Sequence, residues 1–378
     1  MRPALPRLLL LAVITFAFSS AFAQTDSWLG GDGYWESSIH WDHGVPVSSS
    51  DVVINATNQA NTVFLESDST IHSLSMRSSN YNLNDLYVEG GQNFVITQSV
   101  SLGFYSRMFV RSPGTTTVGT NLIDGGELTV SDNSTLKVLG NLTASGGTDL
   151  LTGGNLTVAG NLVNSNYYFG QESTAGTLTV TGQLANIGAS TQKAGMVLAA
   201  TVNAGNVLNA TGGIQVQGGA LTVSGRLNNT DDFGLIGTGA VATVSTLENS
   251  GKIEIYNGTS LQVGSGTRGS TTGYLQYANG TLVEHIYRGA VIKGSAGSTT
   301  LYQGGAVLLD GTLNIQLQSG FNPPIGTTYK IFTFDPGALG GSFANVQNVS
   351  FNNGTEMWQV VYDNADGYVA LKAVSSGT

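Results

Sequence analysis

Apolar and polar residues alternate along this chain in short stretches that recur at a nearly constant interval. The clearest stretch has the pattern G-x-L-T-V, and most copies continue as x-G-x-L. Alternation with a two-residue period predicts a β-strand, and Thr and Val favour extended backbone. The Gly after the Val favours a turn, so the next Leu begins another short strand. The copies occupy residues 126–130, 154–162, 176–184 and 219–227, with weaker ones at 241–244 and 261–263.

The interval between copies indicates the architecture. Leu128 and Leu156 are 28 residues apart, and Leu156 and Leu178 are 22 apart. Leu178 and Leu221 are 43 apart, which is about two steps, and Leu221 and Val241 are 20 apart. A period of this size with occasional insertions is typical of a solenoid. We therefore predict an all-β chain folded as a single-stranded parallel β-helix of about 20–22 residues per coil. An antiparallel sandwich or barrel is the less favoured alternative.

The ends of the chain depart from the repeat. Three of the four tryptophans lie in residues 24–50, together with several glycine turns, and we predict a Trp-rich N-terminal cap there. Residues 51–320 are predicted to form the parallel β-helix repeats. Residues 321–378 are rich in Phe and predict a C-terminal β-rich cap module. Such caps are expected because open terminal strands would pair with other molecules.

Residues 1–23 have the features of a secretory signal peptide. Arg2 and Arg7 precede an apolar run at 8–18, and residues 21–23 form a small-x-small cleavage pattern. The apolar run is too short to cross a bilayer, which takes about 20 residues, and no later run reaches that length. We therefore expect a protein without a transmembrane helix that is secreted or displayed on the cell surface after cleavage.

The composition narrows the classes of function. The chain has 378 residues with 52 glycines, no cysteine, 40% hydrophobic and 10% charged residues, and a net charge of -10. The absence of cysteine excludes disulfides and thiolate metal sites. The apolar content excludes most disordered chains, and the acidic charge argues against nucleic acid as a partner. We expect no cofactor, with calcium as an open alternative, and polysaccharide or other surface proteins as partners.

Several stretches resemble known bacterial surface proteins. The opening W-L-G-G-D-G-Y-W, followed by D-V-V-I and I-H-S-L-S-M, resembles the start of exported β-helix proteins, including autotransporter-passenger-like repeat proteins. The G-x-L-T-V-x-G-x-L units are similar to autotransporter-associated β-strand repeats, and residues 311–362 are similar to the end of such passengers. The resemblance implies a β-helix at the bacterial cell surface. Neither a membrane barrel nor a Pro-Glu-Pro sorting tail follows, so we expect a released or non-covalently held protein, or part of a longer one.

Two groups of ionisable residues are candidates for catalysis. Asp231 and Asp232 follow a repeat, where a pair of carboxylates could serve glycoside hydrolysis or bind calcium. Glu284, His285 and Arg288 form the second group, in which a base beside a carboxylate could serve polysaccharide β-elimination. A solvated turn explains the first group and an exposed strand explains the second. We favour these structural explanations.

One segment is a candidate metal site. His40, Asp42 and His43 offer imidazole and carboxylate ligands of the kind that zinc takes. Along a strand, His40 and Asp42 share a side that His43 does not, so a further ligand would have to come from elsewhere. The alternative that we favour is a polar loop inside the cap.

Aromatic residues in irregular stretches are candidates for ligand binding. Tyr167, Tyr168 and Phe169 interrupt the repeat, and Tyr274 and Tyr277 lie in another irregular stretch. Carbohydrates stack on exposed rings, but an apolar plug beneath an insertion would use the same residues.

Taken together, these features predict an exported, non-enzymatic surface or matrix protein with a role in adhesion, the cell envelope or biofilm structure. One alternative is an extracellular polysaccharide lyase or glycoside hydrolase on a β-helix scaffold, which rests on fold analogy. The other is a carbohydrate-binding protein.

Overall fold

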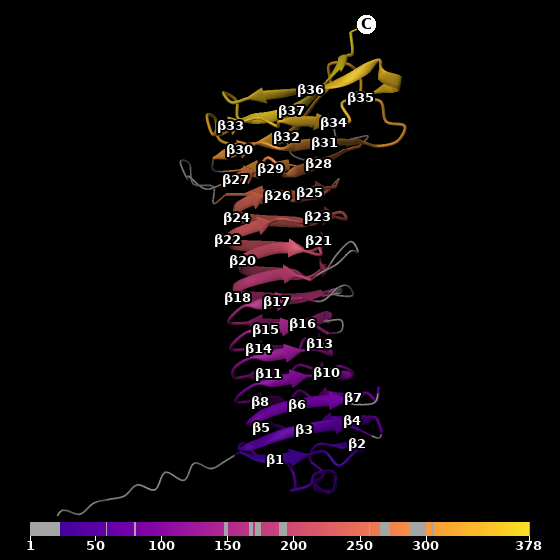
Figure 1. Cartoon of the computed structure of the whole chain (residues 1–378), viewed down its shortest axis with the longest axis vertical. Coiled ribbons are helices and arrows are strands. Elements are labelled where there is room, and N and C mark those ends of the chain that lie inside the picture. The colour runs from indigo at the N-terminus through magenta and orange to yellow at the C-terminus, as the bar shows by residue number, and fades with distance from the viewer. Residues whose placement is uncertain are drawn as a thin grey trace, which may run out of the picture.

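The chain forms a long parallel β-solenoid, which confirms the predicted fold class (Figure 1). This computed structural model describes residues 23–57, 59–78, 81–146, 150–165, 169–170, 175–188, 195–256, 258–264, 273–287, 300–303 and 306–377. In these residues the helical segments are two short 3-10 turns, Ser38–His40 and Asn352–Gly354. The predicted signal peptide lies outside the described residues, apart from Ala23.

Each coil contributes short strands to three faces, which we label A, B and C. Face A begins the coil and is built of strands that pair in parallel from one coil to the next. Its strands are β1 (Gln24–Ser27), β3 (Ser50–Ala56), β6 (Ser73–Ser78), β9 (Val100–Leu102), β12 (Leu122–Asp124), β15 (Leu142–Ala144), β17 (Leu162–Asn164), the second halves of β18 (Ala175–Ile187), β20 (Thr201–Thr211), β22 (Ala220–Asn229) and β24 (Val241–Asn249), then β27 (Tyr274–Gln276), β30 (Val307–Leu309) and β33 (Leu339–Gly341).

Face B follows face A along each coil and carries the candidate sites described below. Its strands in the N-terminal half are β2 (Gly31–Tyr34), β4 (Asn61–Leu65), β7 (Asn84–Val88), β10 (Ser106–Val110), β13 (Glu127–Ser131) and the first half of β16 (Leu150–Val158). A separate seven-stranded sheet continues the face as β19 (Met196–Leu198), β21 (Ile214–Gln217), β23 (Asp232–Ile236), β25 (Lys252–Ile255), β28 (Thr281–Ile286), β31 (Thr312–Leu317) and β34 (Asn345–Gln347).

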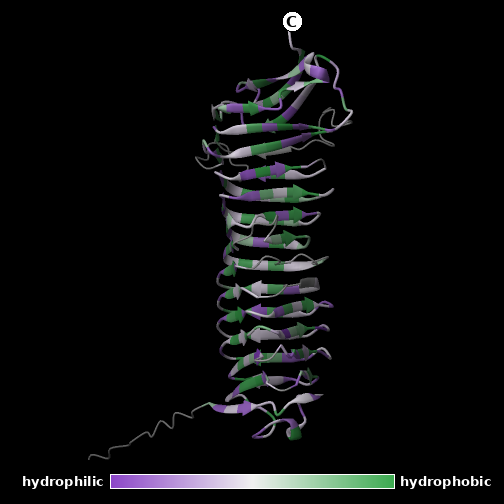
Figure 2. Cartoon of the chain, turned by 45° about the vertical axis from the view of Figure 1, so that its right-hand side comes forward, coloured by the Kyte–Doolittle hydropathy of each residue, from purple (hydrophilic) through white to green (hydrophobic). Residues whose placement is uncertain are grey.

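Face C closes the coil and carries the L-T-V part of the copies at 154–162, 176–184 and 219–227, whereas the first copy, at 126–130, lies in β13 on face B. Leu156 and Val158 lie in register with Leu178 and Val180 of the next coil, and all four side chains are buried. Apolar residues therefore stack inward while the residues between them face outward, which gives the alternating colours along the strands in Figure 2. The face consists of β5 (Ser69–Ile71), β8 (Asn93–Ile96), β11 (Thr115–Val118), β14 (Thr135–Val138), the second half of β16, the first halves of β18, β20, β22 and β24, then β26 (Ser260–Val263), β29 (Thr300–Gln303) and β32 (Thr328–Thr333).

A ladder of asparagines runs through the interior where face A ends. The amide nitrogens of the first four members donate to Oδ1 of the next coil's asparagine, at distances of 2.7–3.2 Å, and that of the fifth donates to the Thr281 carbonyl. All five side chains are fully buried. These hydrogen bonds satisfy the buried side-chain amides and link each coil to the next. The members are Asn164, Asn186, Asn209, Asn229 and Asn249.

Aromatic residues cover the N-terminal end of the rod. Trp28, Trp35 and Trp41 are buried, and Trp28 forms an antiparallel bridge to Trp41. The Trp35 ring contacts Phe94 of the core with a centroid distance of 5.4 Å. The apolar interior is therefore shielded from water at this end, although β1 and β2 already pair in parallel with β3 and β4.

The C-terminal end changes from parallel to antiparallel pairing. Parallel pairing continues past residue 320, where β33 pairs with β30 and β34 with β31. Strand β32 then pairs antiparallel with β37 (Tyr368–Ser375), which pairs with β36 (Glu356–Asp363), and β36 pairs with β35 (Ser350–Phe351). Trp358 is buried beneath these strands. The antiparallel layer thus closes the upper end of the rod in Figure 1.

Candidate functional site

A column of aromatic rings runs along the outside of face B in the N-terminal half. Phe64 and Tyr87 stack with their centroids 5.3 Å apart and their planes at 14°, and Tyr87 and Phe109 stack at 4.6 Å and 8°. Tyr34 extends the column to the end of the rod, 5.8 Å from Phe64. Because these rings face one another along the rod, most of each ring face is covered by its neighbour.

Two arginines flank this aromatic column. The Arg111 guanidinium lies 4.5 Å from the centroid of Tyr87 and 4.8 Å from that of Phe109. Arg107 donates to both carboxylate oxygens of Asp85, at 2.7 and 2.5 Å. This two-pronged hydrogen bond raises the pKa of Arg107 and fixes the orientation of its guanidinium.

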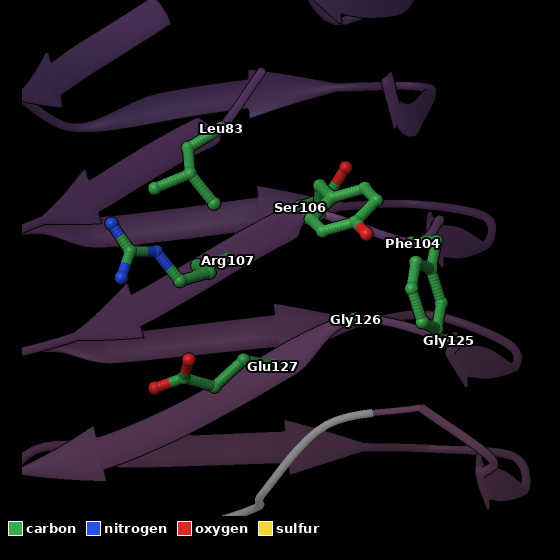
Figure 3. Close-up of a pocket in the computed structure, with 8 residues that line it drawn as sticks. Leu83, Phe104, Ser106, Arg107, Gly125, Gly126 and Glu127 are labelled. Atoms are coloured by element: carbon green, nitrogen blue, oxygen red, sulfur yellow. The ribbon is translucent and has the colours of Figure 1, made fainter. Parts of the chain in front are cut away.

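Beside the column, at the corner between faces A and B, lies a pocket of about 250 Å³. Figure 3 shows the side chains of Leu83, Arg107 and Glu127, which come from three successive coils, along one side of this pocket. The complete lining is Leu83, Phe104, Tyr105, Ser106, Arg107, Gly125, Gly126 and Glu127.

The pocket exists because aromatic residues in one coil are followed by glycines in the next. A Cβ at Gly126 would lie 2.0 Å from the carbonyl oxygen of Ser106, so no side chain fits there. Phe104 is 67% exposed at the edge of the pocket, and its ring contacts Tyr105 edge-on at 4.8 Å. The ring of Tyr81, from the preceding coil, contacts Tyr105 at 5.2 Å. The result is a cluster of rings that open to solvent.

Both tyrosines of this ring cluster have an unusual backbone conformation. Tyr81 and Tyr105 both have φ of 60°, in the left-handed region that bulky side chains rarely adopt. Such a conformation costs free energy and persists where the surrounding structure imposes it, often at a functional site. Here it belongs to the turns that carry the two rings at the outer edge of the pocket.

A second group, which we call the polar cluster, lies on the outside of face B in the C-terminal half. Lys252 Nζ is 3.2 Å from Asp232 Oδ2 and 3.2 Å from Glu254 Oε2. Glu254 Oε1 is 2.9 Å from His285 Nε2 and accepts a hydrogen bond from the Tyr256 hydroxyl at 3.1 Å. The rings of Tyr256 and His285 stack at 4.1 Å. The structure thus brings together two of the predicted residues, Asp232 and His285, with three others.

Three side chains of the polar cluster have shifted pKa values. The hydrogen bond with His285 and the charge of Lys252 outweigh burial and lower the pKa of Glu254 to about 2. Burial alone would lower the pKa of Lys252, but Asp232 and Glu254 raise it. Burial and Glu254 raise the pKa of Tyr256. A general acid needs a raised carboxyl pKa, and a Lys or Tyr base needs a lowered one, so these shifts do not suit Glu254 as an acid or Lys252 and Tyr256 as bases.

The other predicted catalytic residues are not part of this cluster. Asp231 Oδ2 accepts a hydrogen bond from the Gly212 backbone at 2.6 Å and so holds a turn. Glu284 is fully buried and points into the core, whereas its neighbour His285 points outward. The predicted exposed pair of Glu284 and His285 is therefore split between two sides of the strand. Arg288 lies outside the described residues.

The predicted metal ligands separate into two environments. His40 stacks on Trp28 with centroids 4.7 Å apart and planes at 11°. Asp42 and His43 contact each other, with Oδ1 and Nδ1 3.0 Å apart, and Asp26 lies close to His43. The expected grouping of His40 with Asp42 is therefore wrong, because Asp42 lies beside His43 and Asp26 while His40 belongs to the tryptophan cap.

Two of the five predicted aromatic ligand-binding residues cannot contact a ligand from outside the rod. Phe169 and Tyr274 are buried in the core, so their interpretation as exposed rings is wrong. Tyr277 is 41% exposed, and its hydroxyl lies 3.4 Å from Glu248. Tyr167 and Tyr168 lie outside the described residues.

The aromatic column and the pocket escaped the sequence analysis. Phe64, Tyr87 and Phe109 are separated by 23 and 22 residues, so the coil period itself was the signal that could have found the column. The pocket gives no comparable signal, because it depends on Gly125 and Gly126 lying beneath Tyr105 in the fold.

No protein-family model matches this chain, and a search of curated proteins finds no match. Within the described residues, no helix is both long enough and apolar enough to cross a bilayer. The function therefore has to follow from the geometry of the aromatic column, the pocket and the polar cluster.

Proposed function

We propose that this chain is an exported, non-enzymatic β-helix of the cell surface or extracellular matrix that adheres to glycans through the pocket on face B. The observation that carries the proposal is the exposed Phe104 ring, held against Tyr105 at the edge of a pocket that also contains Arg107 and Glu127. The signal-peptide pattern at residues 1–23 supports export.

The lining of the pocket suits a sugar. The apolar C–H face of a pyranose stacks on an aromatic ring, and its hydroxyls take hydrogen bonds from charged or amide groups. Phe104 offers a free ring, while Arg107 and Glu127 offer donors and acceptors. Arg107 is held in place by Asp85, so little side-chain entropy is lost on binding.

The size of the pocket and the charge of the chain restrict the class of ligand further. The pocket volume of about 250 Å³ lies below the roughly 300–1,000 Å³ that encloses a drug-sized molecule, so the pocket suits one unit of a longer glycan. The net charge of -10 repels polyanions at long range. A neutral polysaccharide is therefore the expected ligand class.

A lyase or hydrolase is the weaker alternative, although β-helices provide surfaces on which acids and bases can gather. Its best site is the polar cluster, where Glu254 is held ionised and the shifts of Lys252 and Tyr256 oppose their action as bases. The cluster has the character of a static ion-pair network that stabilises face B.

Binding is tested by affinity electrophoresis of the purified chain in gels that contain neutral or acidic polysaccharides. Retardation by a neutral polysaccharide is expected, and Phe104→Ala weakens it roughly tenfold, since a stacking contact contributes about 1–1.5 kcal/mol. Tyr277→Ala is the matched control, because it removes an exposed ring elsewhere on the rod. Equal losses in the two variants would contradict the pocket assignment.

The enzymatic alternative is tested with the same panel by following new reducing ends and unsaturated products. No turnover is expected. Depolymerisation that disappears in Asp232→Ala and in His285→Ala would replace the adhesive proposal with an enzyme whose site is the polar cluster.

A further inference from the structure

Three potential metal ligands converge in the N-terminal cap. His43 Nδ1 lies 3.0 Å from Asp42 Oδ1 and 3.8 Å from Asp26 Oδ1. One ligand atom of each residue lies within 4.8 Å of the other two. The residues come from two segments, because Asp26 lies in β1 while Asp42 and His43 follow Trp41.

Asp26 is a buried carboxylate with little to compensate for its lost hydration. Its side chain is only 5% exposed, and its one side-chain hydrogen bond comes from Gln24 Nε2 at 3.1 Å. Among the described residues, no lysine or arginine lies within ion-pair distance of it, and the only potentially cationic neighbour is His43. A buried carboxylate is stable when a cation compensates for its lost hydration.

The spacing of the ligand atoms fits a small divalent ion. In tetrahedral zinc sites, nitrogen and oxygen ligands lie about 2.0–2.2 Å from the metal, which places ligand atoms about 3.4 Å apart. The observed separations of 3.0 and 3.8 Å lie on either side of that value. The separation of the two carboxylates is at most 4.8 Å, so small movements of the side chains would bring all three ligands around one ion.

The position of Asp42 is fixed before any ion binds. Its Oδ1 accepts a hydrogen bond from the Ser27 backbone nitrogen at 2.7 Å, and its own nitrogen donates to the Ser27 carbonyl at 3.2 Å. The adjacent bridge between Trp28 and Trp41 holds the two segments together. The His43 side chain is 54% exposed and has room to reorient toward both carboxylates.

We propose that Asp26, Asp42 and His43 form a binding site for a divalent transition metal, with Zn²⁺ as the best fit and water completing the shell. The imidazole ligand favours zinc over calcium, which prefers six to eight oxygen ligands. The bound ion ties the first strand of the rod to the tryptophan cap, and its binding free energy adds to the stability of that end.

The test is calorimetric titration of the purified chain with zinc chloride and, separately, with calcium chloride. The expected result is one zinc per chain and no comparable calcium binding. His43→Ala should weaken zinc binding at least tenfold, and it should fold because the His43 side chain is 54% exposed. His72→Ala is the matched control, because His72 also contacts a carboxylate, Asp51 Oδ1 at 2.8 Å, without a third ligand.

Thermal unfolding provides a second readout. Zinc should raise the Tm of the parent chain and of His72→Ala but not that of His43→Ala. The proposal is overturned if the parent chain takes up no zinc, in which case the contact is a simple hydrogen bond between His43 and Asp42. It is equally overturned if His43→Ala binds zinc as tightly as the parent does.

Discussion

The side-chain nitrogen of Asn209 donates to Oδ1 of Asn229, one coil further along the rod, at 2.7 Å, and both side chains are fully buried. The same nitrogen donates to the Asp232 carbonyl at 2.8 Å, and Asn209 Oδ1 accepts from Asn186 at 3.2 Å. Each asparagine therefore joins three coils, and the loss of one would leave its neighbours with unmet hydrogen bonds.

Asn209→Ala should lower the free energy of unfolding by about 1–3 kcal/mol, because it leaves buried polar groups on Asn186 and Asn229 without their partner. Urea unfolding measures the loss. Asn228→Ala is the control, since Asn228 lies one residue before Asn229, and its half-buried outward side chain predicts a change within about 0.5 kcal/mol. Similar losses in both variants would show that the ladder has no special role.

The left-handed backbone of Tyr105 predicts a conflict between stability and binding. Asparagine tolerates φ near 60° better than tyrosine does, so Tyr105→Asn should keep or raise the stability by up to about 1 kcal/mol. The same change removes a ring from the pocket and should weaken glycan retardation severalfold. Tm and affinity electrophoresis on one preparation check both parts. A marked fall in Tm would show that the packing of the ring outweighs the strain.

The polar cluster predicts a pH dependence of stability. The hydrogen bond with His285, followed by the charge of Lys252, lowers the pKa of Glu254 from 4.5 to about 2 in the folded chain. A carboxyl with a depressed folded-state pKa stabilises the fold above its unfolded-state pKa, and that contribution is lost as the pH falls from about 4.5 towards 2.

The contribution should be on the order of 1–2 kcal/mol after allowance for solvent screening at this partly exposed site. Glu254→Gln should therefore be less stable than the parent at pH 7, and the gap should narrow below pH 4.5. Chemical unfolding at pH 7 and pH 3 measures both values. A gap that stays constant with pH would mean that Glu254 contributes through packing rather than through its charge.

The repeat could be predicted from the sequence because its cause is local. Leu156 and Val158 alternate with polar residues, and the same pattern recurs one coil later at Leu178 and Val180. Strand period and coil period together specify stacked parallel strands.

The candidate sites could not be predicted in the same way, because they depend on which coils are neighbours. Asp26 and His43 meet only because the cap folds back along β1. Asp232 and Glu254 share Lys252, which is in register with Asp232 and lies in the same strand as Glu254. Insertions of unequal length hide these relations in the sequence. Inward or outward direction is equally hidden where the pattern is irregular, as the burial of Tyr274 shows.

Glu284 is a carboxylate inside the apolar core of the rod, and its contribution to stability can be tested. It is fully buried at an inward position of β28, in register with Ile255 of the preceding coil and Ile315 of the next. Its charge also helps burial to raise the pKa of Tyr274, which places the carboxyl near that ring inside the rod. A carboxylate in such a column has lost its hydration, and an apolar side chain of similar size would fit the stack.

Glu284→Leu should nevertheless lower the free energy of unfolding by about 3–5 kcal/mol, because Glu284 takes part in a polar interaction inside the rod and the change removes one member of it. Glu254→Leu is the matched control on the outer side of face B, and it should destabilise because it strips Lys252 and His285 of their shared carboxylate. Urea unfolding at pH 7 compares the two. A gain of stability in Glu284→Leu would show instead that the lost hydration of the buried carboxyl outweighs its polar contacts.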